Sequence, residues 1–296
     1  MKLLSQYGGG IRGVLEVRLM RRIAAEVPRF VDLPDKLGGA SIGGINALWL
    51  AAGKGLDELE DFYHRNAETI FKSRGVLDDL TPDELFRANF AHEDIYGVLT
   101  EAFGDLKMGE LGKPVLIPSF DMVSWDCKFW TRGDKDVLVR DVARMTSAAP
   151  TYWPTHLWNL DGGVFNNNPS DSLVAEAHFE LRSAGVADPC KEISCLSVST
   201  GRVPHTPPSE DPDWDAGVTD MLPLLLDVIF DGGVRASHGR TKRMLGERYH
   251  LVEPALPGVI SLSDAGEIPL LLRIADLFDI DEAVEWVRRN WLAGTA

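Results

Sequence analysis

The spacing of hydrophobic positions predicts strands and helices that alternate along the chain. The run KLLSQY at residues 2–7 is strand-like, three glycines interrupt it, and apolar residues then recur at helical spacing over residues 14–27. A second short apolar element ends at Leu37, and the small-residue turn GGASIGG separates it from a helical segment at residues 45–53. Two successive units of strand, glycine turn and helix are typical of an α/β fold with a mainly parallel central sheet covered by helices on both faces.

Later segments continue this alternation after a helical insertion. Residues 56–103 are predicted to be mostly helical, with one helix start at Pro82 and Glu84 and another at His92. Strands are predicted at residues 114–120, 127–131, 156–160, 193–200 and 247–253, a helix at 170–185, an exposed loop rich in proline and acid at 204–215, and two or three helices after it. We expect a single domain over residues 1–296.

Composition and charge narrow the range of partners. The chain has 296 residues, of which 45% are hydrophobic, and this is ample for a buried core. The formal net charge of -15 argues against nucleic acid and against general attraction to anionic lipid, so any membrane-surface contact is expected to be transient and local or apolar. No apolar run approaches the roughly 20 residues of a membrane span, and no secretory signal is visible. Three cysteines without metal-ligand spacing fit a reduced, cytoplasmic setting, and the oligomeric state stays open.

The sharpest chemical signal is the sequence GASIG at residues 39–43, a GxSxG placed between a predicted strand and a predicted helix. Small flanking residues let the backbone turn tightly, so that Ser41 projects at the head of the helix close to backbone donors. This is the spacing of a nucleophile elbow. The same motif also occurs in glycine-rich turns that only pack a helix on a sheet, so the context decides between the two interpretations.

The amino-terminal sequence GGGIRG at residues 8–13 offers free backbone N–H groups beside a helix start. Such a loop can form an oxyanion hole. It lacks the lysine of a Walker motif and the full GxGxxG spacing, which leaves nucleotide binding as a weak rival, and a structural turn is the plain alternative. Arg12 adds a permanent cation, which either binds a phosphate or carboxylate of the substrate or is a solvated arginine at a helix start.

Asp161 carries the third signal, because it stands at a strand end beside two glycines that allow close approach of another group. An aspartate in this position can reach a serine hydroxyl and act as a general base. The alternative is an ordinary Asp-Gly turn. The asparagines at residues 166–168 are more typical of side chains that fix a loop through backbone hydrogen bonds than of catalytic groups.

Taken in order, five motifs resemble those of the patatin-like phospholipases. They are the amino-terminal glycine loop, GASIGGINA from residue 39, ARMTSAAPTYWP at 143–154, DGGVFNNNP at 161–169 and SVSTG at 197–201. The segment PVLIPSFD is also similar to the central strand of that family. The resemblance covers residues 3–201, whereas residues 202–296 match no motif of the family and are predicted to be a mostly helical part of the same domain.

The resemblance implies a catalytic dyad without histidine, in which Ser41 is similar to the family's nucleophile and Asp161 to its base. It also implies oxyanion-hole donors at Gly9 and Gly10, and it matches Arg12 with the family's loop arginine. Enzymes of this kind cleave carboxylic esters of lipids through a covalent acyl-enzyme and need no metal or organic cofactor. Phospholipids, lysophospholipids, galactolipids, neutral glycerides and short artificial esters are all compatible substrates.

One position departs from the family pattern, because the family loop begins DGGG and this chain has Tyr7 where that aspartate would stand. If the aspartate sets the oxyanion geometry, its loss lowers activity; if it only shapes the loop, a tyrosine with another hydrogen-bond partner is tolerated. This departure motivates a second hypothesis, a lipid-binding or interaction protein with the same fold and impaired turnover. The apolar stretches at residues 221–230 and 268–278 are then candidates for covering an acyl chain, although such helices are more often core elements.

A third hypothesis is a conventional Ser-His-Asp esterase. His178, His205, His238 and His250 all follow Asp161, which is the chain order of such triads. None of them stands in a small-residue catalytic loop, and His178 lies within a predicted helix. We therefore expect the dyad and an active hydrolase.

Overall fold

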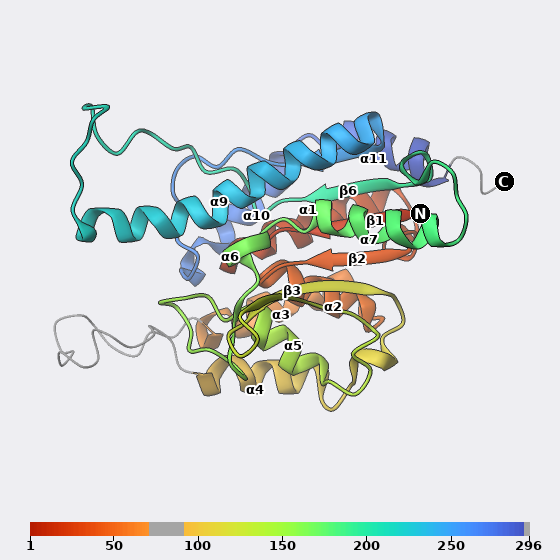
Figure 1. Ribbon diagram of the computed structural model, residues 1–296, viewed down its shortest axis with the longest axis horizontal. Coiled ribbons are helices and arrows are strands. Elements are labelled where there is room, and N and C mark those ends of the chain that lie inside the picture. Colours follow the sequence, from red (N-terminus) through yellow and green to blue (C-terminus); the bar gives the residue numbers. More distant parts are fainter. Residues whose placement is uncertain (71–91, 293–296) are drawn as a thin grey trace.

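The computed structural model of the chain describes residues 1–70 and 92–292. Within these residues a seven-stranded sheet has the order β4-β3-β2-β1-β6-β7, and β5 pairs with β3 outside this path (Figure 1). Neighbouring strands from β3 to β7 along this order are parallel, whereas β4 and β5 run antiparallel to β3. The prediction of a mainly parallel sheet is therefore confirmed. The strands are β1 (Lys2–Gln6), β2 (Lys36–Gly39), β3 (Val115–Asp121), β4 (Asp126–Trp130), β5 (Asn159–Asp161), β6 (Ser194–Val198) and β7 (Tyr249–Val252).

Helices cover both faces of the sheet, as predicted (Figure 1). One face packs against α7 and α9, and the other packs against α1, α2 and α11, with α10 outside α1. The helices are α1 (Gly13–Glu26), α2 (Ile42–Ala51), α3 (Leu56–Ile70), α4 (His92–Phe103), α5 (Val139–Thr146), α6 (Gly163–Asn166), α7 (Ser170–Ser183), α8 (Pro189–Glu192), α9 (Val218–Leu245), α10 (Ile268–Leu277) and α11 (Asp281–Val287).

Two apolar clusters form the core, one on each face. The smaller cluster joins Leu3 of β1 to Leu173 of α7, and the larger cluster joins Leu4 of β1 to Leu15 of α1 and Leu48 of α2. Adjacent residues of β1 thus point into different clusters, which is the alternation that a strand buried on both faces requires.

The parallel arrangement brings the candidate functional segments to one edge of the sheet. The glycine loop follows the carboxyl end of β1, Ser41 follows that of β2, and the SVSTG segment spans that of β6. Antiparallel pairing of β5 sets Asp161 opposite Ser119, near the carboxyl end of β3. In open α/β sheets this edge is where ligands bind.

The predicted elements agree with the structure except at their bounds. The helical insertion is confirmed at its ends by α3 and α4, and the helix start at Pro82 and Glu84 lies outside the described residues. β5 is shorter than the predicted strand because His156 and Asn159 exchange backbone hydrogen bonds around a tight turn. In the described parts of the chain, no helix has the length and apolar character needed to cross a bilayer.

Candidate active site

Ser41 occupies the sharp turn between β2 and α2. Its backbone has φ 53° and ψ -124°, outside the regions that ordinary L-residues favour. The turn needs glycine on both sides, since a Cβ on Gly39 would lie 2.0 Å from the Gly43 carbonyl oxygen, and one on Gly43 would lie 2.5 Å from the Gln6 carbonyl oxygen. The Ser41 amide donates to Thr146 Oγ1 at 3.1 Å, which fixes the turn against α5. This geometry is that of a nucleophile elbow.

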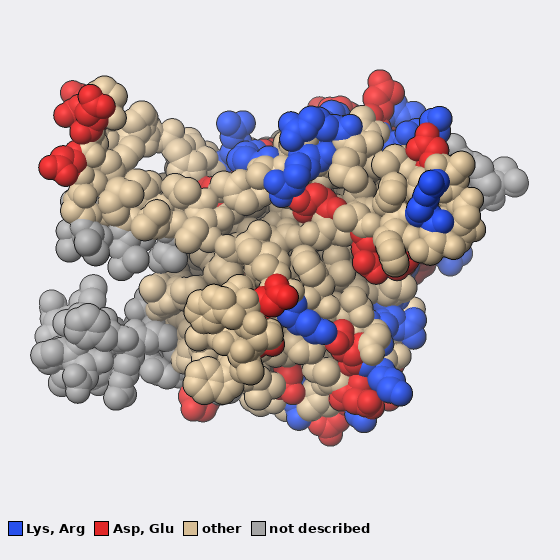
Figure 2. Space-filling model, viewed as in Figure 1, with Lys and Arg blue, Asp and Glu red and all other residues tan. Residues whose placement is uncertain are grey.

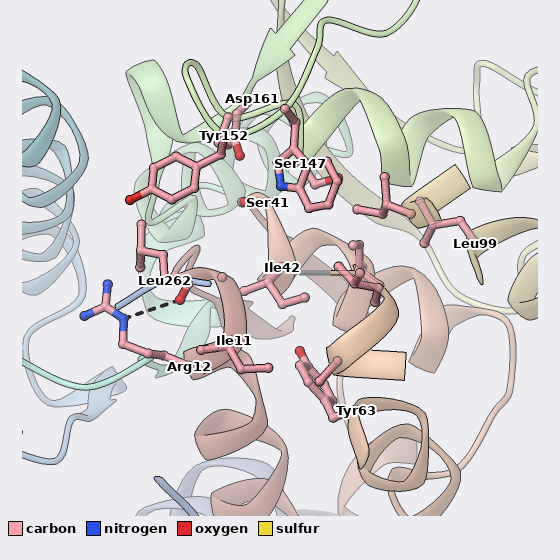
Figure 3. A pocket seen from close by; sticks show the side chains of 18 of the residues that line it. Ile11, Arg12, Ser41, Ile42, Tyr63, Leu99, Ser147, Tyr152, Asp161 and Leu262 are labelled. Carbon is pink, nitrogen blue, oxygen red and sulfur yellow. Dashed lines mark hydrogen bonds between the residues drawn. The ribbon is translucent and has the colours of Figure 1, made fainter. Parts of the chain in front are cut away.

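Asp161 lies opposite this serine, at the end of β5. The side chain is fully buried, and Oδ1 accepts a hydrogen bond from the Gly163 amide at 2.6 Å. Its second oxygen, Oδ2, has no hydrogen-bond partner among the described residues. Figure 3 shows the Ser41 and Asp161 side chains directed toward one another at the wall of a cavity. A buried carboxylate oxygen that faces a hydroxyl is a suitable proton acceptor.

Burial dominates the protonation equilibrium of this carboxyl group. Removal from water raises the pKa of Asp161 from 3.8 to about 7, while the Ser41 hydroxyl, the Gly163 amide and the Arg144 guanidinium act in the opposite direction. A large fraction of the side chain is therefore an unprotonated base at neutral pH. A base with a pKa near the working pH is more effective than an ordinary aspartate.

Arg144 supplies the positive charge that acts on this base. The side chain is fully buried on α5, lies 5.6 Å from the ring of Trp153, and donates from Nη2 to the Pro154 carbonyl oxygen at 2.7 Å. Burial lowers the pKa of Arg144 to about 10, so the guanidinium still carries its charge at neutral pH. Its charge favours the ionised form of Asp161.

The glycine loop after β1 has the form of an oxyanion hole. Gly10 has φ +57°, and a Cβ there would lie 2.1 Å from the Leu262 carbonyl oxygen, so only glycine fits. The loop is held on both sides, because the Gly8 amide donates to the Asn167 carbonyl oxygen at 3.0 Å and Thr200 Oγ1 donates to the Gly8 carbonyl oxygen at 2.9 Å. Within the described residues, the amides of Gly9 and Gly10 make no hydrogen bond, and both glycines line the cavity beside Ser41.

Arg12 lines the same cavity but is mostly buried. Its Nε donates to the Gly9 carbonyl oxygen at 3.3 Å (Figure 3). A contact with the loop backbone indicates that Arg12 shapes the glycine loop, in addition to any role toward a substrate. The solvated arginine considered from the sequence does not fit this burial.

Tyr7, at the position of the family's aspartate, has hydrogen-bond partners of its own. Its hydroxyl accepts from Asn168 Nδ2 at 2.7 Å and lies 3.5 Å from the Tyr249 hydroxyl. Its amide donates to the buried carboxyl group of Glu16 at 2.7 Å, and Asn46 Nδ2 donates to the other oxygen of Glu16 at 3.2 Å. Tyr7 and Glu16 thus fix the start of the glycine loop by contacts that do not involve an aspartate.

An apolar cavity extends from Ser41 into the space beneath α3 and α4 (Figure 3). Gly9, Gly10, Ser41 and Asp161 form its polar end. The rest is lined by apolar and aromatic side chains, which include Ile11, Ile42, Ile45, Phe62, Tyr63, Ala67, Ile70, Ile95, Leu99, Tyr152, Trp153, Phe230 and Leu262. A cavity of this kind suits a hydrocarbon chain whose reacting carbonyl group lies at Ser41.

The histidines give no support to a catalytic triad. None of the described residues that line this cavity is a histidine. His205 contacts Asp231 at 2.6 Å, His238 contacts the Tyr249 hydroxyl at 3.2 Å, and His178 lies on α7. Over residues 1–70 and 92–292, no group of three His, Cys, Asp or Glu side chains is placed to hold a metal ion.

The structure also identifies supporting residues to which sequence reasoning gave no role. Thr146 and Thr200 hold the elbow and the glycine loop, Arg144 acts on Asp161, and Glu16 binds the Tyr7 amide. Three of these residues, Thr146, Arg144 and Thr200, lie inside motifs named in the sequence analysis. The motifs indicate where such residues lie in the sequence, but they do not predict which groups these residues contact. Glu16 gave no signal, because a glutamate within a helical pattern is ordinarily solvated.

Comparisons with known proteins identify the family to which the chain belongs. The model of the family described as patatin-like phospholipase matches residues 4–174, which is more than half of the chain. Protein teg of Priestia megaterium is 23% identical over 98% of both chains, and its match therefore includes most of the part after residue 201.

Two other relatives match a smaller share of the chain, and one solved structure matches most of the chain at low sequence identity. The cGAMP-activated phospholipase of Vibrio cholerae is 29% identical over 68% of this chain and 64% of its own length, and patatin-like protein 2 of Arabidopsis thaliana is 28% identical over 63% and 54%. The solved structure of VipD from Legionella pneumophila has a TM-score of 0.45 at 11% identity, covering 93% of this chain and 66% of VipD. On the family match, the chain belongs to the patatin-like phospholipases, a family of lipid hydrolases.

Proposed function

We propose that this protein hydrolyses carboxylic esters of lipids through an acyl-enzyme on Ser41, with Asp161 as the general base. The observation that carries the proposal is the strained Ser41 elbow facing a buried aspartate whose pKa is raised to about 7, at the polar end of an apolar cavity. Family membership supports the same chemistry.

In the first half of the reaction, Ser41 Oγ attacks the ester carbonyl carbon and Asp161 takes the hydroxyl proton. The carbonyl oxygen becomes an oxyanion, which the Gly9 and Gly10 amides stabilise by hydrogen bonds. The bond between the carbonyl carbon and the alcohol oxygen then breaks, and the leaving alcohol takes the proton from Asp161. The fatty acyl group stays attached to Ser41.

In the second half, a water molecule attacks the acyl carbonyl carbon and gives its proton to Asp161. The bond from the acyl carbon to Ser41 Oγ breaks, the serine recovers its proton, and the fatty acid leaves. The mechanism uses the same base and the same oxyanion donors twice, so it requires neither a histidine nor a cofactor.

The cavity supports a substrate with a hydrocarbon chain next to the ester. Its lining beyond Ser41 is almost wholly apolar. Apart from Asp161, Arg12 is the only charged side chain among the described residues that line the cavity. We place the acyl chain under α3 and α4, and the alcohol part of the substrate on the side of Arg12.

The test is release of product from p-nitrophenyl esters of graded chain length and from lipid vesicles. Ser41→Ala and Asp161→Asn should each abolish turnover while circular dichroism shows an intact fold. Ser147→Ala is the matched control, since this serine also lines the cavity but its hydroxyl donates to the Ala143 carbonyl oxygen at 2.8 Å. A wild type that binds lipid without turnover would favour the binding-protein hypothesis, and full activity in either dyad variant would refute the mechanism.

A further inference from the structure

Two adjacent turns expose large apolar side chains. One is the turn between β3 and β4, where Val123 and Trp125 are 75% and 73% exposed, and the other precedes β5, where Leu157 and Trp158 are 61% and 67% exposed. The turns lie side by side, because the Met122 amide donates to the Trp158 carbonyl oxygen at 2.8 Å. We call Val123, Trp125, Leu157 and Trp158 the tryptophan patch. Its two indole groups, at up to about 250 Å² each, leave on the order of 300 Å² exposed, which is the scale of a functional surface patch.

The backbone conformation of these turns is unfavourable for the bulky residues that they contain. Trp125, Leu157 and Trp158 have φ of 57°, 46° and 59°, in the left-handed region. Leu157 and Trp158 are the two central residues of a turn closed by mutual hydrogen bonds of His156 and Asn159, a position at which Asn-Gly is the favoured pair. Folding alone would favour glycine or asparagine at all three positions. Strain carried by exposed tryptophans therefore points to a function on the surface.

The patch lies close along the chain to residues of the candidate active site. Trp158 directly precedes β5 and is three residues from Asp161, a span of at most about 11 Å. Tyr152 and Trp153, which precede this turn, line the cavity. Figure 2 shows that the surface over this end of β3 and the loop after α5 is mainly uncharged. Residues 152–161 thus connect the cavity lining to the tryptophan patch.

The charges beside the patch distinguish between lipid classes. Asp121 and Asp126 flank the β3–β4 turn, and Lys128 is bound to Asp134 at 2.7 Å, while the chain as a whole carries a net charge of -15. An anionic surface is therefore disfavoured. Tryptophan prefers the interface between water and a hydrocarbon layer, where the ring is buried and the indole N–H stays hydrated.

We propose that the tryptophan patch is the surface by which this protein rests on a zwitterionic lipid layer, so that a lipid can pass from the layer into the cavity at Ser41. The delivery of lipid to Ser41 rests on the proposed function, whereas binding to the lipid layer is measured separately from turnover. Ile229 on α9 is also exposed, and it directly precedes Phe230, which lines the cavity.

Docking is tested by co-sedimentation with phosphatidylcholine vesicles, in a Ser41→Ala background so that no product alters the vesicles. Replacing both tryptophans, Trp125→Asn and Trp158→Asn, should lower the bound fraction at least about tenfold, because most of the apolar contact area is removed. Phe179→Asn is the matched control, since Phe179 is 68% exposed on α7, which contributes no residue to the described cavity lining. It should leave binding unchanged, and added phosphatidylserine should weaken binding of the parent protein.

Two further measurements separate docking from a structural role and from the proposed function. The double variant should unfold at the same or a higher temperature than its parent, because asparagine tolerates positive φ, and with Ser41 present it should hydrolyse soluble p-nitrophenyl butyrate at the parent rate. If the enzyme hydrolyses no ester at all, the proposed function fails while the sedimentation result still decides docking. The proposal would be overturned by unchanged vesicle binding or a lowered unfolding temperature in the double variant, or by tighter binding of the parent protein to anionic vesicles. It would also be overturned if the parent protein did not bind vesicles but self-associated, and the double variant did not self-associate.

Discussion

Substitution of Asp161 by asparagine should stabilise the folded protein while it abolishes turnover. Asparagine has the shape of the protonated side chain and carries no charge to be buried. The pKa of Asp161 rises from 3.8 to about 7 on folding, so the folded protein takes up a proton between these values and its stability falls as pH rises through that window. Above pH 7 the ionised side chain destabilises the folded state by on the order of 4 kcal/mol, an upper limit because Asp161 is fully buried and its environment relaxes.

The difference between the two proteins should depend on pH. From the same pKa values, the advantage of Asp161→Asn in the free energy of unfolding grows by on the order of 3 kcal/mol between about pH 5 and about pH 8. Urea unfolding of both proteins across this range measures the difference directly, and other titrating groups such as Glu16 cancel in it to first order. A difference that does not change with pH, or a variant less stable than the wild type at pH 8, would refute the burial argument for Asp161.

Three other substitutions test separate parts of the site. Because Asp161 acts as a base only when it is unprotonated, kcat/KM should rise with pH through about 7. Arg144→Met should move this rise to higher pH, since the guanidinium of Arg144 lowers the pKa of Asp161. An unmoved pH profile in a folded Arg144→Met variant would contradict this effect of Arg144 on Asp161. Gly10→Ala should lower kcat on the order of a hundredfold. Gly104→Ala is the control, because Gly104 has a similar φ of 54° but open space around its Cβ, and it should leave kcat unchanged. Equal losses of kcat in both variants would contradict a special role of the glycine loop. Ala67→Leu should lower kcat/KM for long-chain esters relative to the butyrate ester by on the order of tenfold, because it fills the cavity beneath α3, and an unchanged chain-length profile would place the acyl chain elsewhere.

The fold was largely predictable because local patterns agree with the final arrangement. The glycine turns after residues 7 and 37 interrupt apolar runs, and each is followed by a helical period, so the repeated unit of a parallel sheet was visible. The turn at Leu157 and Trp158 was missed, because two bulky apolar residues favour a strand and nothing local indicates positive φ. That disagreement between local preference and structure is also what singles out the tryptophan patch.

The site was predictable to the level of motifs but not of contacts. Ser41 and Asp161 each stand in a short motif whose residue types suggest chemistry, although the 119 residues between them give no information on their distance in space. The roles of Thr146 and Arg144 depend on α5 packing between the elbow and β5, which only the folded chain defines. Glu16 could not be found from the sequence, because its burial results from the approach of the Tyr7 amide and Asn46.

The central claim is that Ser41 forms the covalent acyl intermediate and that Asp161 activates it. The most direct measurement is labelling with a serine-directed fluorophosphonate that carries an alkyl chain, followed by intact mass and peptide mapping. The account predicts one adduct per chain, on the peptide that contains Ser41, which is absent in Ser41→Ala, much slower in Asp161→Asn, and formed at the wild-type rate in Ser147→Ala. An adduct on another residue, or labelling of Asp161→Asn at the wild-type rate, would contradict it.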